Sequence, residues 1–273
     1  MLIETITSRN NPLVKRFLAA RDGRERRVVF IEGIRLVEEA LRSALPLEAV
    51  AYSPRLSETS RGAALLSALR QQPCRGALLP ETLMAHISDV ETAPGVVALG
   101  RRPIAAFPDA WGDESPLFVL ADGLQSPGNL GALIRTAEAA GATAVMATVG
   151  TADPFQPKAL RASAGAIFRL PILAGPETMA QVRRLRQQGV CLVAADPHGD
   201  TPYDAFDWRR PVIIWFGSEA HGLRTATDSV QQQFDARLAI PMAGRVESLN
   251  VAVAAAILLY EARRRRAVGA GAG

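Results

Sequence analysis

The chain has 273 residues, 48% of them apolar, and a net charge of +4 at pH 7. This composition supports one large core or two smaller ones and excludes a mainly disordered protein. The two cysteines and three histidines have neither disulfide-framework nor zinc-ligand spacing, so we expect no metal. The longest apolar run, Val251–Tyr260, is shorter than the roughly 20 residues that span a bilayer. We therefore expect a cytoplasmic protein with no membrane partner.

The first hundred residues alternate short apolar segments with segments of helical period. Asn11–Pro12 is a signal for the start of a helix. Further strands are expected at Val28–Ile31, Leu47–Tyr52, Cys74–Leu79 and Pro94–Ala98, and helices at Ile34–Ser43, Gly62–Gln71 and Glu81–Ile87. This alternation is typical of a small α/β domain, which we place at residues 1–103. Prolines and a glycine without any period predict a linker at residues 104–116.

Residues 1–27 contain seven basic side chains and three acidic ones. The basic residues are Arg9, Lys15, Arg16, Arg21, Arg24, Arg26 and Arg27. Such a density of cations is suited to phosphate contacts, and it is equally compatible with a solvated helix face.

The second half repeats the alternation and is expected to form one domain at residues 117–266, followed by a flexible tail at 267–273. Strands are expected at Leu117–Ala121, Ala144–Thr148, Cys191–Ala195, Pro211–Phe216 and Arg237–Ile240, with an extended segment at Ile167–Pro171. Helices are expected at Ala132–Ala140, Lys158–Ala164, Thr178–Gln188 and Ala252–Tyr260. The apolar strands favour a buried parallel sheet.

Three polar, glycine-containing loops follow strands of this second half, at residues 122–135, 217–223 and 240–250. Ligands of open α/β sheets bind beyond the carboxyl ends of strands, so we expect the loops to meet at one site. Ser248 or Asn250 could cap the helix that follows. The chain has no GxxxxGK[ST], which argues against P-loop phosphate chemistry, and no GxGxxG after a strand, which argues against a standard dinucleotide or common methyltransferase fingerprint. It also has no GxSxG, which argues against a hydrolase triad. As a structural alternative, Arg135 could form an i,i+3 ion pair with Glu138.

The loops carry three motifs: Asn129-x-Gly131-x-x-x-Arg135, Gly217-Ser218-Glu219-x-x-Gly222-Leu223, and Ile240-Pro241-Met242-x-Gly244-x-x-x-Ser248-Leu249-Asn250-Val251. In order and spacing they closely resemble the motifs of the SpoU (TrmH-like) RNA 2′-O-ribose methyltransferases. Segments 6–15 and 30–41 resemble the substrate-binding domain appended in this family, which is similar to ribosomal protein L30e.

The resemblance implies an α/β-knot (SPOUT) fold, a homodimer formed through the knot domain, and S-adenosylmethionine as methyl donor without a metal. The implied cofactor-binding residues are Gly217, Gly222, Ile240, Met242, Ser248, Leu249 and Asn250. The implied catalytic residues are Arg135, Asn129, Glu219, Ser248 and Asn250. RNA contacts are expected from Arg9, Lys15, Arg16 and Arg35, together with Asn129 and Arg135.

The implied reaction is 2′-O-methylation of RNA, and the first domain favours ribosomal RNA over transfer RNA. A non-catalytic RNA-binding or assembly protein is the alternative from another class. In this family Arg135 is the proposed activator of the 2′-hydroxyl. Because arginine normally keeps its proton, it could instead hold the adjacent phosphate and polarise the hydroxyl.

Overall fold

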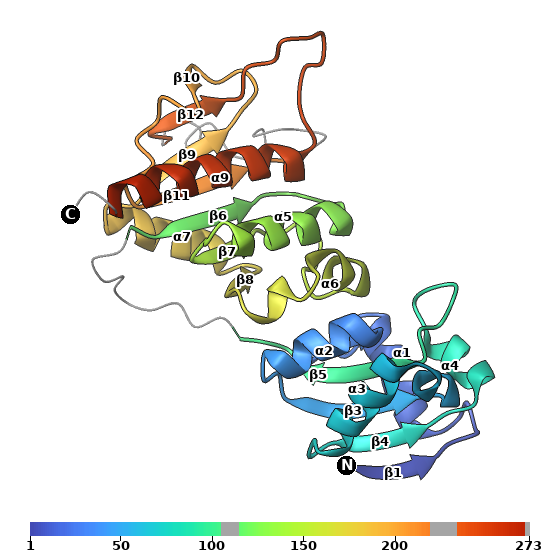
Figure 1. The fold of residues 1–273 in the computed structure, drawn as a ribbon. Coiled ribbons are helices and arrows are strands. Elements are labelled where there is room, and N and C mark those ends of the chain that lie inside the picture. The colour runs from blue at the N-terminus through green and yellow to red at the C-terminus, as the bar shows by residue number, and fades with distance from the viewer. Residues whose placement is uncertain (105–114, 219–233, 271–273) are drawn as a thin grey trace. The chain divides into compact units, whose positions relative to one another are not determined.

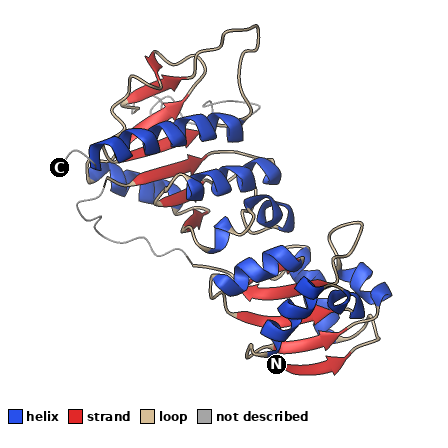
Figure 2. Cartoon of the chain, in the orientation of Figure 1, coloured by secondary structure: helices blue, strands red, loops and turns tan. Residues whose placement is uncertain are grey.

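The computed structural model describes residues 1–104, 115–218 and 234–270, with side chains up to residue 267 (Figure 1). The chain forms two compact units, and both are mixed α/β (Figure 2). The first unit contains Met1–Pro103 and Phe155–Phe168, and the second contains Ile104–Pro154 and Arg169–Gly273. Among the described helices, none combines the length and the apolar character needed to cross a membrane.

The first unit is built on a five-stranded sheet of order β1-β4-β3-β5-β2. Its strands are β1 (Leu2–Thr5), β2 (Val28–Glu32), β3 (Leu47–Tyr52), β4 (Arg75–Leu78) and β5 (Val96–Arg101). Strand β5 runs antiparallel to β3 and β2 on either side of it, and the other four strands all run in the same direction. The helices are α1 (Pro12–Arg21), α2 (Ile34–Arg42), α3 (Ser60–Arg70) and α4 (Glu81–Ile87), with a 3₁₀ turn at Pro54–Glu58. The sequence did not predict β1, because Leu2 and Ile3 are exposed at the sheet edge.

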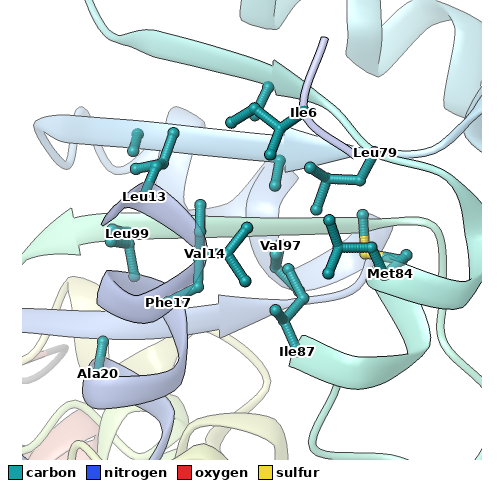
Figure 3. Close-up of a cluster of buried hydrophobic side chains, with 14 of the residues drawn as sticks. Ile6, Leu13, Val14, Phe17, Ala20, Leu79, Met84, Ile87, Val97 and Leu99 are labelled. Carbon is teal, nitrogen blue, oxygen red and sulfur yellow. The ribbon is translucent and has the colours of Figure 1, made fainter. Parts of the chain in front are cut away.

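Helices α1 and α4 pack side by side on this sheet and bury its main apolar core (Figure 3). Phe17 of α1 and Met84 and Ile87 of α4 are fully buried against Val97 and Leu99 of β5. Asn11 caps α1 by accepting the amide hydrogen of Leu13 at 2.8 Å, which confirms the helix start expected at Asn11–Pro12.

A short helix from the second half of the sequence, α6 (Pro157–Ser163), belongs to the first unit. Its Arg161 reaches buried Glu32 of β2, with Nη1 3.7 Å from one Glu32 oxygen and 2.8 Å from a carboxylate oxygen of Asp89. Ser88 Oγ also donates a hydrogen bond to Glu32 at 2.5 Å. Burial raises the pKa of Glu32, the hydrogen bond from Ser88 and the charge of Arg161 oppose that shift, and the charge of the Asp89 carboxylate adds to it. A Cβ at Gly165 would lie 2.6 Å from Glu39 Cβ, so any larger residue at position 165 would require one of the two segments to move.

The second unit has a seven-stranded, fully parallel sheet of order β10-β12-β9-β11-β6-β7-β8. The strands are β6 (Leu117–Ala121), β7 (Ala144–Ala147), β8 (Ile172–Ala174), β9 (Cys191–Ala195), β10 (Thr201–Pro202), β11 (Val212–Phe216) and β12 (Ala236–Ala239). The helices are α5 (Pro127–Ala139), α7 (Thr178–Gln187) and α9 (Val251–Ala270). Helix α7 packs on one face of the sheet through Val182 and Leu185. Helices α5 and α9 lie side by side (Figure 1).

In the second half of the chain, strands β8 and β10 were not predicted from the sequence, and three predicted segments also differ. Residues 166–168 form a 3₁₀ turn, so the extended segment expected at Ile167–Pro171 is wrong there. Helix α5 begins five residues before Ala132, because Ser126 caps it and Pro127 occupies its first turn. Helix α9 continues to Ala270 and so includes the first four residues of the expected tail.

Candidate functional site

The three motif-bearing loops leave the carboxyl ends of β6, β11 and β12. All strands of this sheet are parallel, so these ends lie along one edge. Strand β9 stands between β12 and β11, which places its following loop, residues 196–199, at the same edge. The sequence reasoning did not select that loop, because strand order cannot be read from apolar periodicity.

The base of the first loop is fixed by a buried carboxylate. Asp122 is 7% exposed and accepts hydrogen bonds from Thr148 Oγ1 at 2.6 Å and from Trp215 Nε1 at 3.2 Å. Its own amide donates to the carbonyl of Phe216 at 2.9 Å. Asp122 therefore ties the end of β6 to the end of β11, directly before Gly217. Its side chain is a structural member of the site that the motif comparison alone did not single out.

Helix α5 carries the two residues expected to face the target nucleotide. Ser126 caps the helix by accepting the amide hydrogen of Asn129 at 3.3 Å, so Asn129 lies in the first turn. Arg135 lies in the middle of the helix and is exposed. The alternative ion pair with Glu138 is not formed, because Glu138 binds Arg169 at 2.7 Å. Arg135 pairs with no carboxylate in the described ranges, which leaves its guanidinium available to a ligand.

Asn250 joins the first motif to the third. Its Nδ2 donates to Asn129 Oδ1 at 3.2 Å, and its Oδ1 accepts the amide hydrogen of Ala252 at 2.9 Å. Asn250 is therefore the residue that caps α9, of the two candidates that the sequence offered. Farther along, Arg263 Nη1 donates to the carbonyl of Ala139 at the end of α5. The two helices thus run in the same direction, with both amino ends at the loop edge of the sheet (Figure 1).

This amide pair leads to a testable expectation. Replacing Asn250 with Asp removes the N–H that Asn129 accepts and places two carbonyl-type oxygens in contact. We expect the methyl transfer that the family resemblance implies to fall about 10-fold through misplacement of Asn129, because leaving a hydrogen-bond partner unpaired costs about 1–3 kcal/mol. Steady-state kinetics of the Asn250→Asp, Asn129→Ala and doubly substituted proteins would measure the coupling. Strictly additive losses would show that the two amides act independently.

The third loop offers a mixed apolar and polar surface. Ile240, Met242 and Leu249 are partly buried, whereas Ser248 is exposed. The loop after β11 begins with Gly217 and the buried Ser218. Half-buried apolar side chains beside backbone polar groups fit the adenine and amino-acid parts of S-adenosylmethionine. Glu219 and Gly222 lie outside the described residues.

The basic residues predicted to contact RNA divide into two kinds. Arg9, Lys15 and Arg35 are exposed on the first unit. Arg16 instead lies between two carboxylates, with Nη2 2.8 Å from Glu25 and 2.5 Å from Glu48. These partners raise the already high pKa of Arg16 and compensate its charge. Within the described ranges, no group of three or more histidine, cysteine, aspartate and glutamate side chains is arranged to hold a metal ion.

Comparison with known proteins gives a consistent result. Residues 116–260 match the model of the SpoU rRNA Methylase family, and residues 11–98 match an MRM3-like substrate binding domain. The chain is 34% identical to a 23S rRNA (uridine(2479)-2′-O)-methyltransferase of Streptomyces viridochromogenes, over 97% of this chain and 93% of the relative. It is 32% identical to the 23S rRNA (guanosine(2553)-2′-O)-methyltransferase RlmP of Bacillus subtilis, over 96% of this chain and all of the relative.

A solved structure agrees with these relatives. The SpoU methyltransferase AviRb of S. viridochromogenes, in complex with its cofactor AdoMet, superposes with a TM-score of 0.82 and 31% identity, over 94% of this chain and 99% of that one. This likeness confirms the expected fold class, an α/β-knot domain preceded by a small α/β domain. The matches extend over both halves of the chain and over all three motifs. The protein is therefore a member of the SpoU rRNA methylase family.

Proposed function

We propose that this protein transfers a methyl group from S-adenosylmethionine to a ribose 2′-hydroxyl of 23S ribosomal RNA. The observation that carries the proposal is the contact between Asn129 and Asn250, at 3.2 Å. It brings the motif expected to face the nucleotide onto the motif expected to bind the cofactor. Two relatives that align with this chain over 93% and 100% of their own length are named for 23S rRNA, which favours that substrate over transfer RNA.

The described residues can do different parts of this reaction. The sulfonium of S-adenosylmethionine supplies an activated methyl group when it is bound. The half-buried side chains of Ile240, Met242 and Leu249 would line the apolar part of the cofactor site, with backbone groups at Gly217 beside them. Arg135 is an exposed arginine on α5, so we assign it to the phosphate next to the target ribose. Positioning of the hydroxyl would then supply much of the rate.

We further propose that the active form is a homodimer built on the second unit. Helix α9 exposes Val253 and Tyr260, which are 49% and 50% exposed, and Val246 in the preceding loop is 62% exposed. Apolar side chains on one helix and its entry loop suit burial against a second copy. With ribosomal RNA as substrate, the enzyme would act in the cytoplasm.

The direct test uses purified protein, S-adenosylmethionine with a labelled methyl group, and 23S rRNA, 16S rRNA and transfer RNA in parallel. We expect label in 23S rRNA and, after alkaline hydrolysis, one position resistant to cleavage because its 2′-oxygen is methylated. Label on a base, or label confined to transfer RNA, would contradict the proposal. Absence of S-adenosylmethionine binding by calorimetry would instead favour the non-catalytic alternative.

A further inference from the structure

A buried carboxylate lies directly beyond the carboxyl end of β6. Asp122 is 7% exposed, whereas the other described aspartates and glutamates of the second unit are partly or fully exposed. Burying a carboxylate is costly, and apolar packing could join the same strands without that cost. Asp122 is thus set apart from the other acids of this unit, and it lies at the edge of the sheet that carries the ligand loops.

The alternation of side chains along the strands explains how Asp122 meets its partners. Side chains two residues apart point to the same face, so Asp122 continues the row of Leu120 on β6, and Thr148 continues the row of Met146 on β7. Trp215 of β11 belongs to the same buried face. At the end of this face Asp122 accepts hydrogen bonds from Thr148 Oγ1 at 2.6 Å and from Trp215 Nε1 at 3.2 Å. Thr148 is 8% and Trp215 2% exposed, so both contacts are shielded from water.

Trp215 connects Asp122 to the loop that is expected to bind the cofactor. Only Phe216 separates it from Gly217, where the second motif and this loop begin, and we call the loop from Gly217 onward the cofactor loop. The backbone adds a second link, because the Asp122 amide donates to the Phe216 carbonyl at 2.9 Å. The Trp215 ring also packs edge-on against Phe234, with the ring centres 5.4 Å apart. The end of β11 is therefore held at a fixed place relative to Asp122.

A second set of contacts holds the loop that leads to Asn129, residues 122–126, which we call the RNA loop. The hydroxyl of Thr151 donates to the Ala121 carbonyl at 3.1 Å and accepts the amide hydrogen of Gly123 at 3.0 Å. It thus binds the backbone on both sides of Asp122. The chain then enters α5, whose first turn carries Asn129. These contacts determine where the RNA loop leaves the sheet.

We propose that Asp122 is a positioning residue that holds the cofactor loop and the RNA loop at the separation that methyl transfer requires. The inference rests on the proposed function, and it adds a residue that lies outside the three motifs. Asp122 acts through Trp215 and Thr148, which enclose its carboxylate. Because a misplacement of about 1 Å between reacting groups can cost about 10²-fold in rate, loss of this network lowers kcat more than the affinity for either ligand.

The test removes the two side-chain donors and keeps the carboxylate. A site variant of the full chain combines Thr148→Val with Trp215→Phe, which largely retain the shapes of both side chains. We expect kcat for methylation of 23S rRNA to fall at least about 10-fold, while the dissociation constants for S-adenosylmethionine and RNA change less than about 3-fold. Calorimetry and filter retention measure the two dissociation constants. Thr148→Ser keeps the hydroxyl, so it should recover most of the activity that Thr148→Val alone loses.

The control variant loses the same chemical groups near the opposite ends of the same strands. It combines Thr143→Val with Trp208→Phe. Thr143 directly precedes β7, and its hydroxyl oxygen accepts the amide hydrogen of Leu117 at 3.0 Å. Trp208 is fully buried before β11 and donates its indole hydrogen to the Tyr203 carbonyl at 2.8 Å. Circular dichroism identifies a temperature at which both double variants are folded, and there the control should keep kcat within about 2-fold of the wild type.

Equal losses of kcat in the two double variants would overturn the proposal, since a general loss of stability would then explain both. A site variant with wild-type kcat, or one whose loss is confined to the dissociation constants, would overturn it as well. Methylation by the wild type is recorded in parallel. An active wild type with an equally active site variant refutes only the role of Asp122, whereas a wild type that methylates no RNA refutes the proposed function.

Discussion

Replacing Arg135 with alanine is expected to lower kcat for RNA methylation by about 10²–10³, with little change in the unfolding temperature. Loss of one charged group that stabilises or positions the reacting atoms typically costs this much. Arg135 is exposed on α5, and no described carboxylate holds it, so the fold does not depend on it. The dissociation constant for S-adenosylmethionine should stay within about 2-fold, because Arg135 is assigned to the RNA.

Arg169→Ala is the matched control, since it removes an equal charge beside the same helix by breaking the pair with Glu138. It should leave kcat near the wild-type value. Arg135→Lys separates the two possible roles. A residual rate well above that of the alanine variant would support phosphate binding, which a lysine can partly replace. Wild-type activity in the alanine variant would remove Arg135 from the mechanism.

Replacing Arg266 with alanine is expected to lower the free energy of unfolding of the second unit by about 3–4 kcal/mol. The guanidinium of Arg266 donates to the carbonyls of Ser115 at 2.5 Å, Trp208 at 2.8 Å, Arg210 at 2.9 Å and Pro116 at 3.5 Å. It thus fastens α9 to the segments that lead into β6 and β11. Burial lowers the pKa of Arg266, and removing the side chain would take this donor away from the carbonyls of Ser115, Trp208 and Arg210, while Pro116 would keep the amide of Val212.

Arg264→Ala is the corresponding control, because Arg264 is exposed and binds Glu261 at 2.7 Å within the same helix. Such i,i+3 pairs stabilise a helix by less than about 0.5 kcal/mol. Urea unfolding followed by circular dichroism would measure both variants. Similar midpoints for Arg266→Ala and wild type would show that α9 is held by its apolar face alone.

The sequence predicted the strands that carry the site well, because each is a compact apolar run followed by polar residues and glycine. Leu117–Ala121 and Cys191–Ala195 have the expected limits in the structure. The start of α5 was harder to predict. Its first turn contains Gly128 and Asn129, which favour a loop, but the Ser126 cap and the fixed φ of Pro127 favour the helix.

Contacts between distant residues could not be read from the sequence. Asn129 and Asn250 are 121 positions apart, and periodicity gives no information on which helix ends meet. The charge of Arg16 gives a second example. In the sequence it belongs to a basic segment, but the fold brings Glu48, 32 positions away, into contact with it. Local patterns thus located the loops, whereas strand order and packing determined which side chains meet.

The membership of Phe155–Phe168 in the first unit has a consequence for how such genes can recombine. A crossover in the linker between the two halves would combine the first half of one protein with helix α6 of another. Arg161 would then have to match the acids at the positions of Glu32 and Asp89, and Gly165 would meet a different neighbour than Glu39. Exchange of the substrate-binding half between relatives is therefore expected to succeed only when residues 155–168 are inherited with it.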